Sequence, residues 1–271
     1  MSRTYCEQKV KSLKLDKSQI ALRFAQAGQS YPEQAIVQRK IAQRLFDLIA
    51  QYGVGQYDKV FEIGCGSGNL TQLLMQKLNI KDLILNDLYE DVQQHFNFNV
   101  ISNPQVNWLI GDIEQLEFPQ NLNLVASSSA LQWINDLDAI FKQAFHHLTA
   151  HAELCFSSFG QDNLREIKSL TGQGLSYLSL ENLQDKLQHN GFEILHISEQ
   201  VEQLSFAHPK QVLQHLKATG VTATASSFRW TKQSLMDFYQ NYQQFSYLDE
   251  PGRAMYHLTY HPIYCIARRQ P

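Results

Sequence analysis

The chain has 271 residues, of which 44% are hydrophobic and 18% charged, and its formal net charge is −3. This composition is typical of a globular protein and excludes a low-complexity or intrinsically disordered chain. The sequence lacks the apolar core of a signal peptide and any apolar run of the roughly 20 residues that cross a bilayer. We therefore expect a cytoplasmic protein without a membrane segment.

The positions of the charged residues and cysteines indicate which partners and bound groups to expect. Residues 1–44 hold nine Lys or Arg and three acids, whereas the rest of the chain has 14 Lys or Arg and 23 acids. A basic N-terminal arm on an acidic body favours an anionic partner, although a solvated helix pair would have the same composition. The four cysteines are far apart and the histidines show no paired-ligand spacing, so we expect buried thiols and no metal site.

Two helices are predicted before the first strand. Over residues 16–27, Ile20 and Phe24 share one helix face, and a second amphipathic helix is predicted over 33–51. A ligand of an open α/β sheet lies over the carboxyl ends of the strands. We therefore expect residues 1–52 to form helices that close over the ligand without joining the sheet core.

A strand followed by three glycines is the strongest signal in the sequence. Residues 60–63 run into Gly64, Gly66 and Gly68, and a helical pattern opens at Asn69. A buried strand that turns sharply into a helix brings backbone close to backbone, which glycine tolerates. The free amides at such a helix start suit a polar or anionic group, so the turn predicts a ligand site.

A carboxylate after the second strand indicates the ligand class. Residues 83–86 are an apolar run that leads to Asp87, which can accept both hydroxyl protons of a ribose lying across the strand ends. A dinucleotide fingerprint would require glycine or alanine at Asn69 or Thr71, so that pattern fails. The sequence predicts a nucleoside cofactor that is not a dinucleotide.

Strands and helices alternate after this turn, which predicts a parallel, doubly wound α/β sheet. The predicted strands are 59–63, 82–86, 105–110, 122–127, 152–157, 192–206 and 255–267, and the predicted helices are 69–78, 89–97, 136–148, 180–190, 209–218 and 231–245. Residues 53–206 and 253–271 would form the core, and 207–252 a helical substrate cap between strands six and seven. After the fourth strand, Trp133 either packs beneath the next helix or contacts the ligand.

The pattern Glu62-x-Gly-x-Gly-x-Gly68 resembles motif I of the class I S-adenosylmethionine methyltransferases. This resemblance implies a Rossmann-like sheet of seven strands, mostly parallel with the last strand antiparallel, that binds S-adenosylmethionine. It also implies that Asp112, after the third strand, holds the adenine amino group. The residues expected at the cofactor are Glu62, Gly64, Cys65, Gly66, Gly68, Asp87, Leu88, Asp112, Ile113 and Ser128, with Tyr31 and Gln38 at its methionine end.

Further motifs along the chain indicate one family within the class I methyltransferases. Those that occur together and in order include Phe24-Ala-x-Ala27, Ala130-Leu-Gln-Trp133, Phe156-Ser-Ser-Phe159, Leu216-Lys-Ala-Thr-Gly220 and Leu258-Thr-Tyr-His261. Over residues 17–268 the chain is similar to the malonyl-acyl-carrier-protein O-methyltransferases of biotin synthesis. It departs from their pattern at 149–152, where the family usually has a Pro-Gly pair, and at Val221, where the family often has alanine.

The closer resemblance implies methyl transfer to the free carboxylate of a malonyl thioester. A carboxylic acid with a pKa of about 4 is ionised at pH 7, so we expect alignment to drive the reaction and no catalytic acid or base. The candidates for contact with the substrate are Trp133, Arg165, Lys217, Arg229 and His261. An acidic acyl carrier protein would dock on Lys9, Lys11, Lys14 and Lys17, while coenzyme A is the other carrier left open.

Other interpretations remain. The acceptor could be a quinone ring, a small dicarboxylic acid or a polyketide, with His257 or His261 as the base that a ring hydroxyl needs. A non-catalytic nucleoside-binding subunit would share the cofactor residues. A nucleic-acid methyltransferase is disfavoured, because residues 127–130 lack the Asn-Pro-Pro-Tyr type of base-flipping motif and no basic stripe with interleaved aromatic residues is present.

Overall fold

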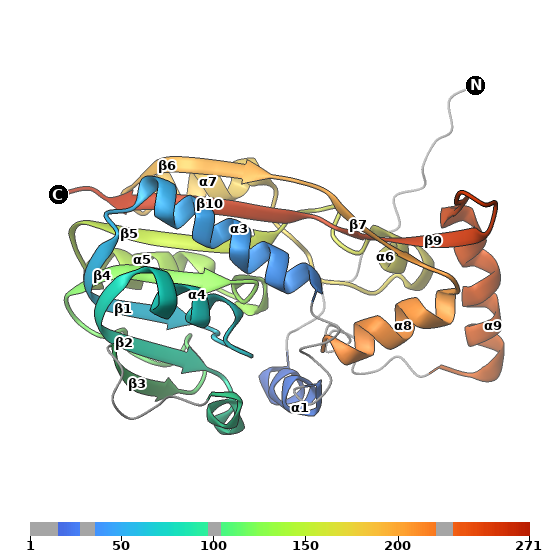
Figure 1. Cartoon of the computed structure of the whole chain (residues 1–271), viewed down its shortest axis with the longest axis horizontal. Coiled ribbons are helices and arrows are strands. Elements are labelled where there is room, and N and C mark those ends of the chain that lie inside the picture. The colour runs from blue at the N-terminus through green and yellow to red at the C-terminus, as the bar shows by residue number, and fades with distance from the viewer. Residues whose placement is uncertain (1–15, 28–35, 97–103, 221–229) are drawn as a thin grey trace.

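A computed structural model of the chain describes residues 16–27, 36–96, 104–220 and 230–271. A seven-stranded sheet runs through it in the order β3-β2-β1-β4-β5-β10-β6 (Figure 1). Its strands are β1 (Gln56–Ile63), β2 (Asn79–Asp87), β3 (Gln105–Ile110), β4 (Leu122–Ser128), β5 (Leu148–Phe159), β6 (Phe192–Glu199) and β10 (Pro262–Arg269). Neighbours among the first five strands are parallel, and β10 is antiparallel to both β5 and β6. The predicted sheet, with its antiparallel last strand, is confirmed.

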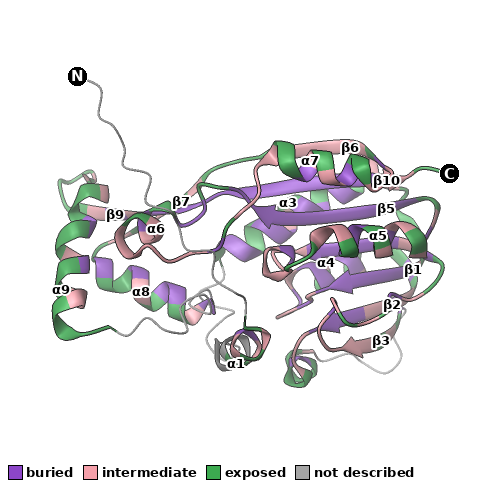
Figure 2. Cartoon of the chain, turned by 180° about the vertical axis from the view of Figure 1, so that it is seen from behind, coloured by how far each residue is buried: buried purple, intermediate pink, exposed green. Residues whose placement is uncertain are grey.

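Alternate residues of the central strands bury the two faces of the sheet. On β1, Val60 packs in one hydrophobic cluster and Phe61 in the other, and both side chains are fully buried. The helices on the first face are α3 (Ile36–Tyr52) and α4 (Asn69–Lys77), and those on the second are α5 (Leu137–His147) and α7 (Leu180–His189) (Figure 2). Because both faces are covered, the strands form nearly continuous apolar runs in the sequence.

The helix α3 is part of the core. Its buried residues include Val37, Ile41 and Leu45, which lie in the same cluster as residues of β1 and β5. The expectation that both N-terminal helices stay outside the sheet core is therefore wrong for α3, because the sheet itself covers its apolar stripe. The helix α1 (Lys17–Ala27) lies apart, near the carboxyl ends of the parallel strands (Figure 1).

A second, antiparallel sheet extends the fold beyond the predicted core. Its order is β7-β9-β8, with β7 (Glu202–Phe206), β8 (Ser246–Leu248) and β9 (Ala254–Tyr260). The strands predicted over 192–206 and 255–267 are each divided between the two sheets, which the sequence did not indicate. Pro262 begins β10 without an N–H for the ladder, and its carbonyl accepts a hydrogen bond from Gln200 N at 3.1 Å where β6 ends.

The segment predicted as a cap lies with the small sheet (Figure 1). Where it is described it contains α8 (Pro209–Ala218), α9 (Lys232–Asn241), the 3-10 helix η4 (Tyr242–Phe245) and β8. The unpredicted helix α6 (Arg165–Thr171) packs against β9 of the small sheet, where the buried Glu166 accepts a hydrogen bond from Thr259 N at 3.0 Å. The helix predicted over 89–97 is a shorter 3-10 helix, η1 (Glu90–His95).

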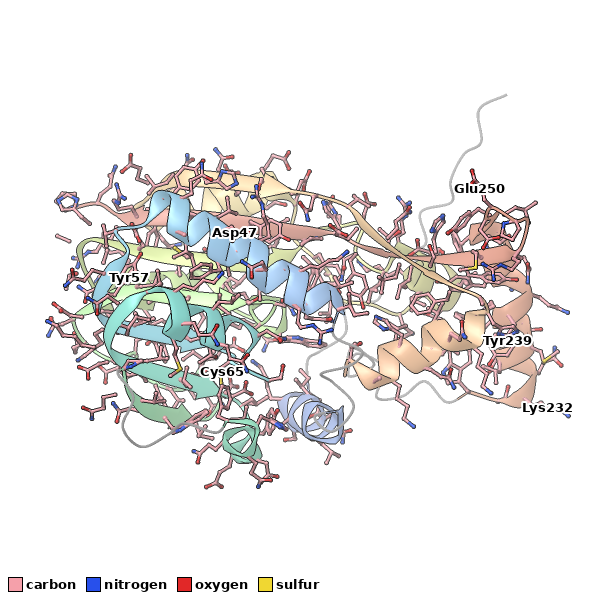
Figure 3. All side chains as sticks on the ribbon, in the orientation of Figure 1. Asp47, Tyr57, Cys65, Lys232, Tyr239 and Glu250 are labelled. Carbon is pink, nitrogen blue, oxygen red and sulfur yellow. The ribbon has the colours of Figure 1, made fainter. Side chains whose placement is uncertain are left out.

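The described residues contain free cysteines, no membrane-spanning helix and no metal-binding cluster. Cys65, Cys155 and Cys265 are buried free thiols, as expected, and Cys6 lies outside the described residues (Figure 3 labels Cys65). None of the described helices is long and apolar enough to cross a membrane. The same part of the chain contains no group of three or more His, Cys, Asp or Glu side chains that could hold a metal ion.

Candidate active site

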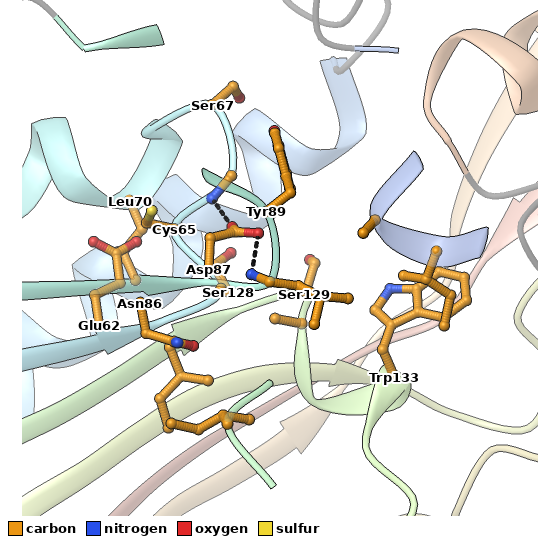
Figure 4. A pocket seen from close by; sticks show the side chains of 18 of the residues that line it. Glu62, Cys65, Ser67, Leu70, Asn86, Asp87, Tyr89, Ser128, Ser129 and Trp133 are labelled. Carbon is orange, nitrogen blue, oxygen red and sulfur yellow. Dashed lines mark hydrogen bonds between the residues drawn. The ribbon is translucent and has the colours of Figure 1, made fainter. Parts of the chain in front are cut away.

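A pocket opens at the carboxyl ends of four neighbouring strands. The turns after β1, β2, β3 and β4 form its wall, together with α1 and the first turn of α3. Its empty volume, including the open mouth, is about 1070 Å³, which is large enough for a cofactor. Figure 4 shows the side chains that line it.

The three glycines after β1 adopt left-handed backbone conformations. The φ angles of Gly64, Gly66 and Gly68 are 68°, 52° and 80°, values that residues with a side chain disfavour. A Cβ on Gly64 would lie 2.4 Å from the Cβ of Ala130, and one on Gly68 would lie 2.6 Å from the ring of Phe96. Glycine is therefore needed for the turn that brings β1 and α4 to the edge of the pocket.

The Asp87 carboxylate is held by the backbone around it. Its Oδ2 accepts a hydrogen bond from Gly66 N at 2.8 Å, and its Oδ1 accepts one from Leu88 N at 2.7 Å (Figure 4). Burial raises the pKa of Asp87 to about 6, and the backbone hydrogen bonds oppose that rise. Each carboxylate oxygen can accept a further donor, so the two oxygens together can accept the hydroxyls of a ribose.

An ion-pair cluster joins α1 to the turn after β3. Lys17 Nζ lies 3.2 Å from Asp112 Oδ1 and 2.6 Å from Glu114 Oε2. Among the described residues Asp112 Oδ2 makes no hydrogen bond, so it can accept one from an adenine amino group. Partial burial raises the pKa of Glu114, but hydrogen bonds from the Lys17 ammonium and from the backbone N–H groups of Asp136 and Asn135 hold this pKa below its ordinary value. Lys17 thus fastens α1 to the pocket wall.

Two buried polar side chains lie where β1 and α3 meet the pocket. Glu62 Oε2 accepts a hydrogen bond from Thr71 Oγ1 at 2.7 Å, and burial raises the pKa of Glu62 to about 8 despite this bond. Gln38 is 7% exposed, and its Oε1 has no hydrogen-bond partner among the described residues. A bound ammonium group would supply a donor to Gln38 and a positive charge beside Glu62.

The segment after β4 forms another part of the pocket wall. Ser127 Oγ donates a hydrogen bond to Ile63 O at 2.9 Å and ties β4 to β1. Ser128, Ser129 and Trp133 then line the pocket, and in Figure 4 the two serines lie between Asp87 and Trp133. Of the two positions that the sequence left open for Trp133, the structure places it in the wall of the site.

Most of the residues predicted at the cofactor come together. Those that line the pocket are Gln38, Glu62, Gly64, Cys65, Gly66, Asp87, Leu88, Asp112, Ile113 and Ser128. Gly68 completes the turn without lining the pocket, and Tyr31 lies outside the described residues. Their contacts with a bound cofactor stay a prediction.

The residues predicted at the substrate are mostly elsewhere. Trp133 lines the pocket, and Arg229 lies outside the described residues. Those that do not line it are Arg165, Lys217 and His261. His261 Nε2 instead lies 3.1 Å from Glu199 Oε2, where the two sheets meet. These positions were predicted from the segments and motifs in which they lie, and neither reveals the direction of a side chain.

Some lining residues escaped prediction. They include Ile20, Ala21 and Asn86, together with Lys17, which had been assigned to the carrier arm. Asn86 carried a signal, because it is a polar residue at the end of an apolar strand. Its Nδ2 donates hydrogen bonds to the carbonyls of Leu109 at 2.8 Å and Gly111 at 3.1 Å. The sequence carried no signal for Lys17, Ile20 and Ala21 of α1, because their contact with the pocket depends on the path of the chain in space.

The residues present fit S-adenosylmethionine. Across the strand ends from β3 to β1 the pocket offers Asp112 for an adenine amino group, Asp87 for a ribose, and the glycine turn with Glu62 for the methionine end. The unpartnered oxygen of Gln38 is the observation that most directly calls for a bound donor.

Comparisons with known proteins agree with this fit. The profile described as "Methyltransferase domain" matches residues 60–151. A malonyl-[acyl-carrier protein] O-methyltransferase from Acinetobacter baylyi is 49% identical over 257 residues, which cover 94% of this chain and 98% of that protein. One from Bacteroides helcogenes is 36% identical and covers 94% of this chain and 100% of its own. The solved N-methyltransferase NodS of Bradyrhizobium japonicum, in complex with S-adenosyl-L-homocysteine, has a TM-score of 0.51 at 12% identity, covering 86% of this chain and 87% of that one.

The seven-stranded sheet and the pocket at its strand ends define an S-adenosylmethionine-dependent methyltransferase of class I. Sequence identity over nearly the whole of both chains is more specific than the fold. The chain belongs to the malonyl-[acyl-carrier protein] O-methyltransferase family.

Proposed function

We propose that this chain transfers the methyl group of S-adenosylmethionine to the free carboxylate of a malonyl group held as a thioester on acyl carrier protein. The observation that carries the proposal is the 49% identity to the Acinetobacter baylyi relative over 94% of the chain. The methyl ester would mask the malonyl carboxylate, so that fatty-acid enzymes could elongate the group toward the pimeloyl chain of biotin.

When bound, S-adenosylmethionine supplies a methyl group on a positively charged sulfur. A malonyl carboxylate with a pKa of about 4 is already ionised at pH 7, so the chain has to align the reactants rather than move a proton. A carboxylate oxygen bonds to the methyl carbon while the carbon–sulfur bond breaks, and the electron pair stays on sulfur. The opposite charges cancel, so exclusion of water by Ile20 and Ala21 of α1, which line the pocket, favours the step.

The pH dependence of turnover tests the class of nucleophile. With a malonyl thioester and saturating S-adenosylmethionine, kcat/KM for the thioester should be level above about pH 7. The malonyl carboxylate is then ionised, and the ribose and ammonium of the bound cofactor favour the ionised forms of Asp87 and Glu62. A ring hydroxyl with a pKa of about 10 would give a rate that keeps rising with pH. His257 and His261, the bases considered for such an acceptor, do not line the pocket. A rate that still climbs above pH 8 would count against a carboxylate acceptor.

The basic N-terminal arm is the part of the chain that we assign to docking of the carrier. Lys9, Lys11 and Lys14 lie outside the described residues. We no longer assign Lys17 to docking of the carrier, because it is paired with Asp112 and Glu114 and its side chain is only 21% exposed. Acyl carrier proteins are acidic, so the three remaining lysines would attract the carrier over a distance that added salt shortens.

Neutralising Lys9, Lys11 and Lys14 together should raise KM for malonyl-carrier protein severalfold and leave KM for malonyl-coenzyme A unchanged. A matched control neutralises three exposed lysines of the core, Lys77, Lys81 and Lys142. Steady-state kinetics at low and high salt give the comparison, and the loss should shrink at high salt. Equal losses with both thioesters would contradict docking on the arm.

A further inference from the structure

The malonyl carboxylate needs a partner that the predicted cations do not provide. Neither Arg165 nor Lys217 lines the pocket. Among the described lining residues Lys17 is the one Lys or Arg, and its ammonium is engaged by Asp112 and Glu114. In the part of the pocket that the structure describes, no Lys or Arg is therefore free to orient the carboxylate, which leaves the neutral donors of the wall and the ring of His95.

Ser129 has a buried hydroxyl with nothing to bond. It lines the pocket, and its Oγ has no hydrogen-bond partner among the described residues. Its φ angle is 56°, and of the four non-glycine residues with positive φ that the structure describes, it alone lines the pocket. Strained backbone and unpaired buried polar atoms persist where a function requires them.

The backbone of Ser129 is fixed on both sides. Its N–H donates to Ser157 O at 3.2 Å and to Ser157 Oγ at 3.1 Å, while its carbonyl accepts a hydrogen bond from Gln132 Nε2. These bonds hold the left-handed conformation and so determine where the side chain starts. None of them involves the hydroxyl.

The position of Ser129 across the sheet places it on the acceptor side. The groups that fit adenine, ribose and methionine follow β3, β2 and β1 in that order, and β4 is the next strand. Ser129 follows β4, and in Figure 4 it lies between Asp87 and Trp133. A group that reaches the methyl from beyond the cofactor would enter at this wall.

We propose that the Ser129 hydroxyl donates a hydrogen bond to the malonyl carboxylate and orients its second oxygen toward the methyl group; this assignment rests on the proposed function. A neutral donor leaves more negative charge on the attacking oxygen than a bidentate guanidinium would. The new carbon–oxygen bond forms as the carbon–sulfur bond breaks, sulfur keeps the electron pair, and the serine keeps its proton.

Two substitutions separate the hydroxyl from the strained backbone. Ser129→Ala removes the hydroxyl and keeps the strain, whereas Ser129→Gly removes both, since glycine accepts positive φ. Asn121→Ala is the control, because Asn121 is exposed outside the pocket and has a φ of 59°. Each protein is assayed for methyl-ester formation and for binding of S-adenosylmethionine. The Kd of each protein for malonyl-coenzyme A and for acetyl-coenzyme A is also measured, in the presence of S-adenosylhomocysteine.

Both Ser129 variants should lose roughly 10- to 100-fold in kcat/KM for the malonyl thioester, the effect expected for a hydrogen bond to a charged group. Their Kd for malonyl-coenzyme A should rise, while those for acetyl-coenzyme A and S-adenosylmethionine stay unchanged. Equal weakening of both thioesters, weakened cofactor binding instead, or undiminished activity would each overturn the assignment. Failure of the wild type to form any ester would instead refute the proposed function.

Discussion

Replacement of Asp87 by asparagine probes the cofactor site at its central residue. Both carboxylate oxygens accept backbone N–H groups, from Gly66 and Leu88. The asparagine side chain offers one oxygen and one NH2 group, so the NH2 would face one of these donors and leave it unpaired. An unpaired buried donor costs about 1–3 kcal/mol, while removal of the buried carboxylate charge offsets this cost above about pH 6. For a chain of 271 residues we therefore expect Tm at pH 7 to change by less than about 5 °C.

The effect of this substitution on binding should be larger. Loss of one hydrogen bond between the carboxylate and a ribose hydroxyl, with weakening of the other, costs about 2–4 kcal/mol. The Kd for S-adenosylmethionine should therefore rise about 30- to 1000-fold, as measured by isothermal titration calorimetry. Asp82→Asn is the control, because Asp82 is on the same strand but does not line the pocket. If D87N bound the cofactor as tightly as the wild type does, the ribose assignment would be refuted.

The pH dependence of Asp87 gives a second readout with a definite sign. Burial raises its pKa from 3.8 to about 6, and ribose hydroxyls bind the ionised form. The affinity of the wild type for S-adenosylmethionine should therefore strengthen as pH rises through about 6, and D87N should not show this change. The free energy of unfolding of the free protein changes in the opposite direction from cofactor affinity. A raised pKa contributes stability that is present below about pH 4 and lost as pH rises through about 6 in the free protein.

Two further substitutions follow from the same pocket. Burial raises the pKa of Glu62 to about 8, so its contribution to stability is present below about pH 4.5 and lost as pH rises through 8. Glu62→Gln should remove this loss, as seen by urea unfolding at pH 6 and pH 9; an unchanged pH dependence would contradict the buried acid. Lys17→Met should speed dissociation of S-adenosylmethionine severalfold in stopped-flow experiments and change Tm little, because an ion pair of this exposure is worth about 1 kcal/mol. Lys40→Met, at a lysine with a 62% exposed side chain, is the control, and equal dissociation rates would refute the role of Lys17 in holding α1.

The parts of the fold that the sequence predicted are those determined by local patterns. The glycine turn could be recognised because φ angles of 68°, 52° and 80° require residues without side chains. Asp87 and Asp112 could be recognised because each follows an apolar strand, and parallel strands bring their carboxyl ends to one edge. The antiparallel β10 came from the resemblance to class I methyltransferases rather than from periodicity.

What the sequence did not predict depends on contacts between distant segments. Two long strands are divided between the large and the small sheet, one after Glu199 and the other at His261, and no local pattern reveals this. Lys17 belongs to a basic run in the sequence, yet in space it pairs with Asp112, 95 positions away. The positive φ of Ser129 is likewise visible only in the structure.

The central claim is that this chain methylates a malonyl carboxylate. The most direct measurement is mass spectrometry of malonyl-acyl carrier protein after incubation with the protein and S-adenosylmethionine, with acetyl-acyl carrier protein as the control. The malonyl group should gain the mass of one methyl ester that mild base removes, and the acetyl group should gain nothing. An unmodified malonyl group, with methyl transfer instead to a quinone or a free dicarboxylic acid, would contradict the account.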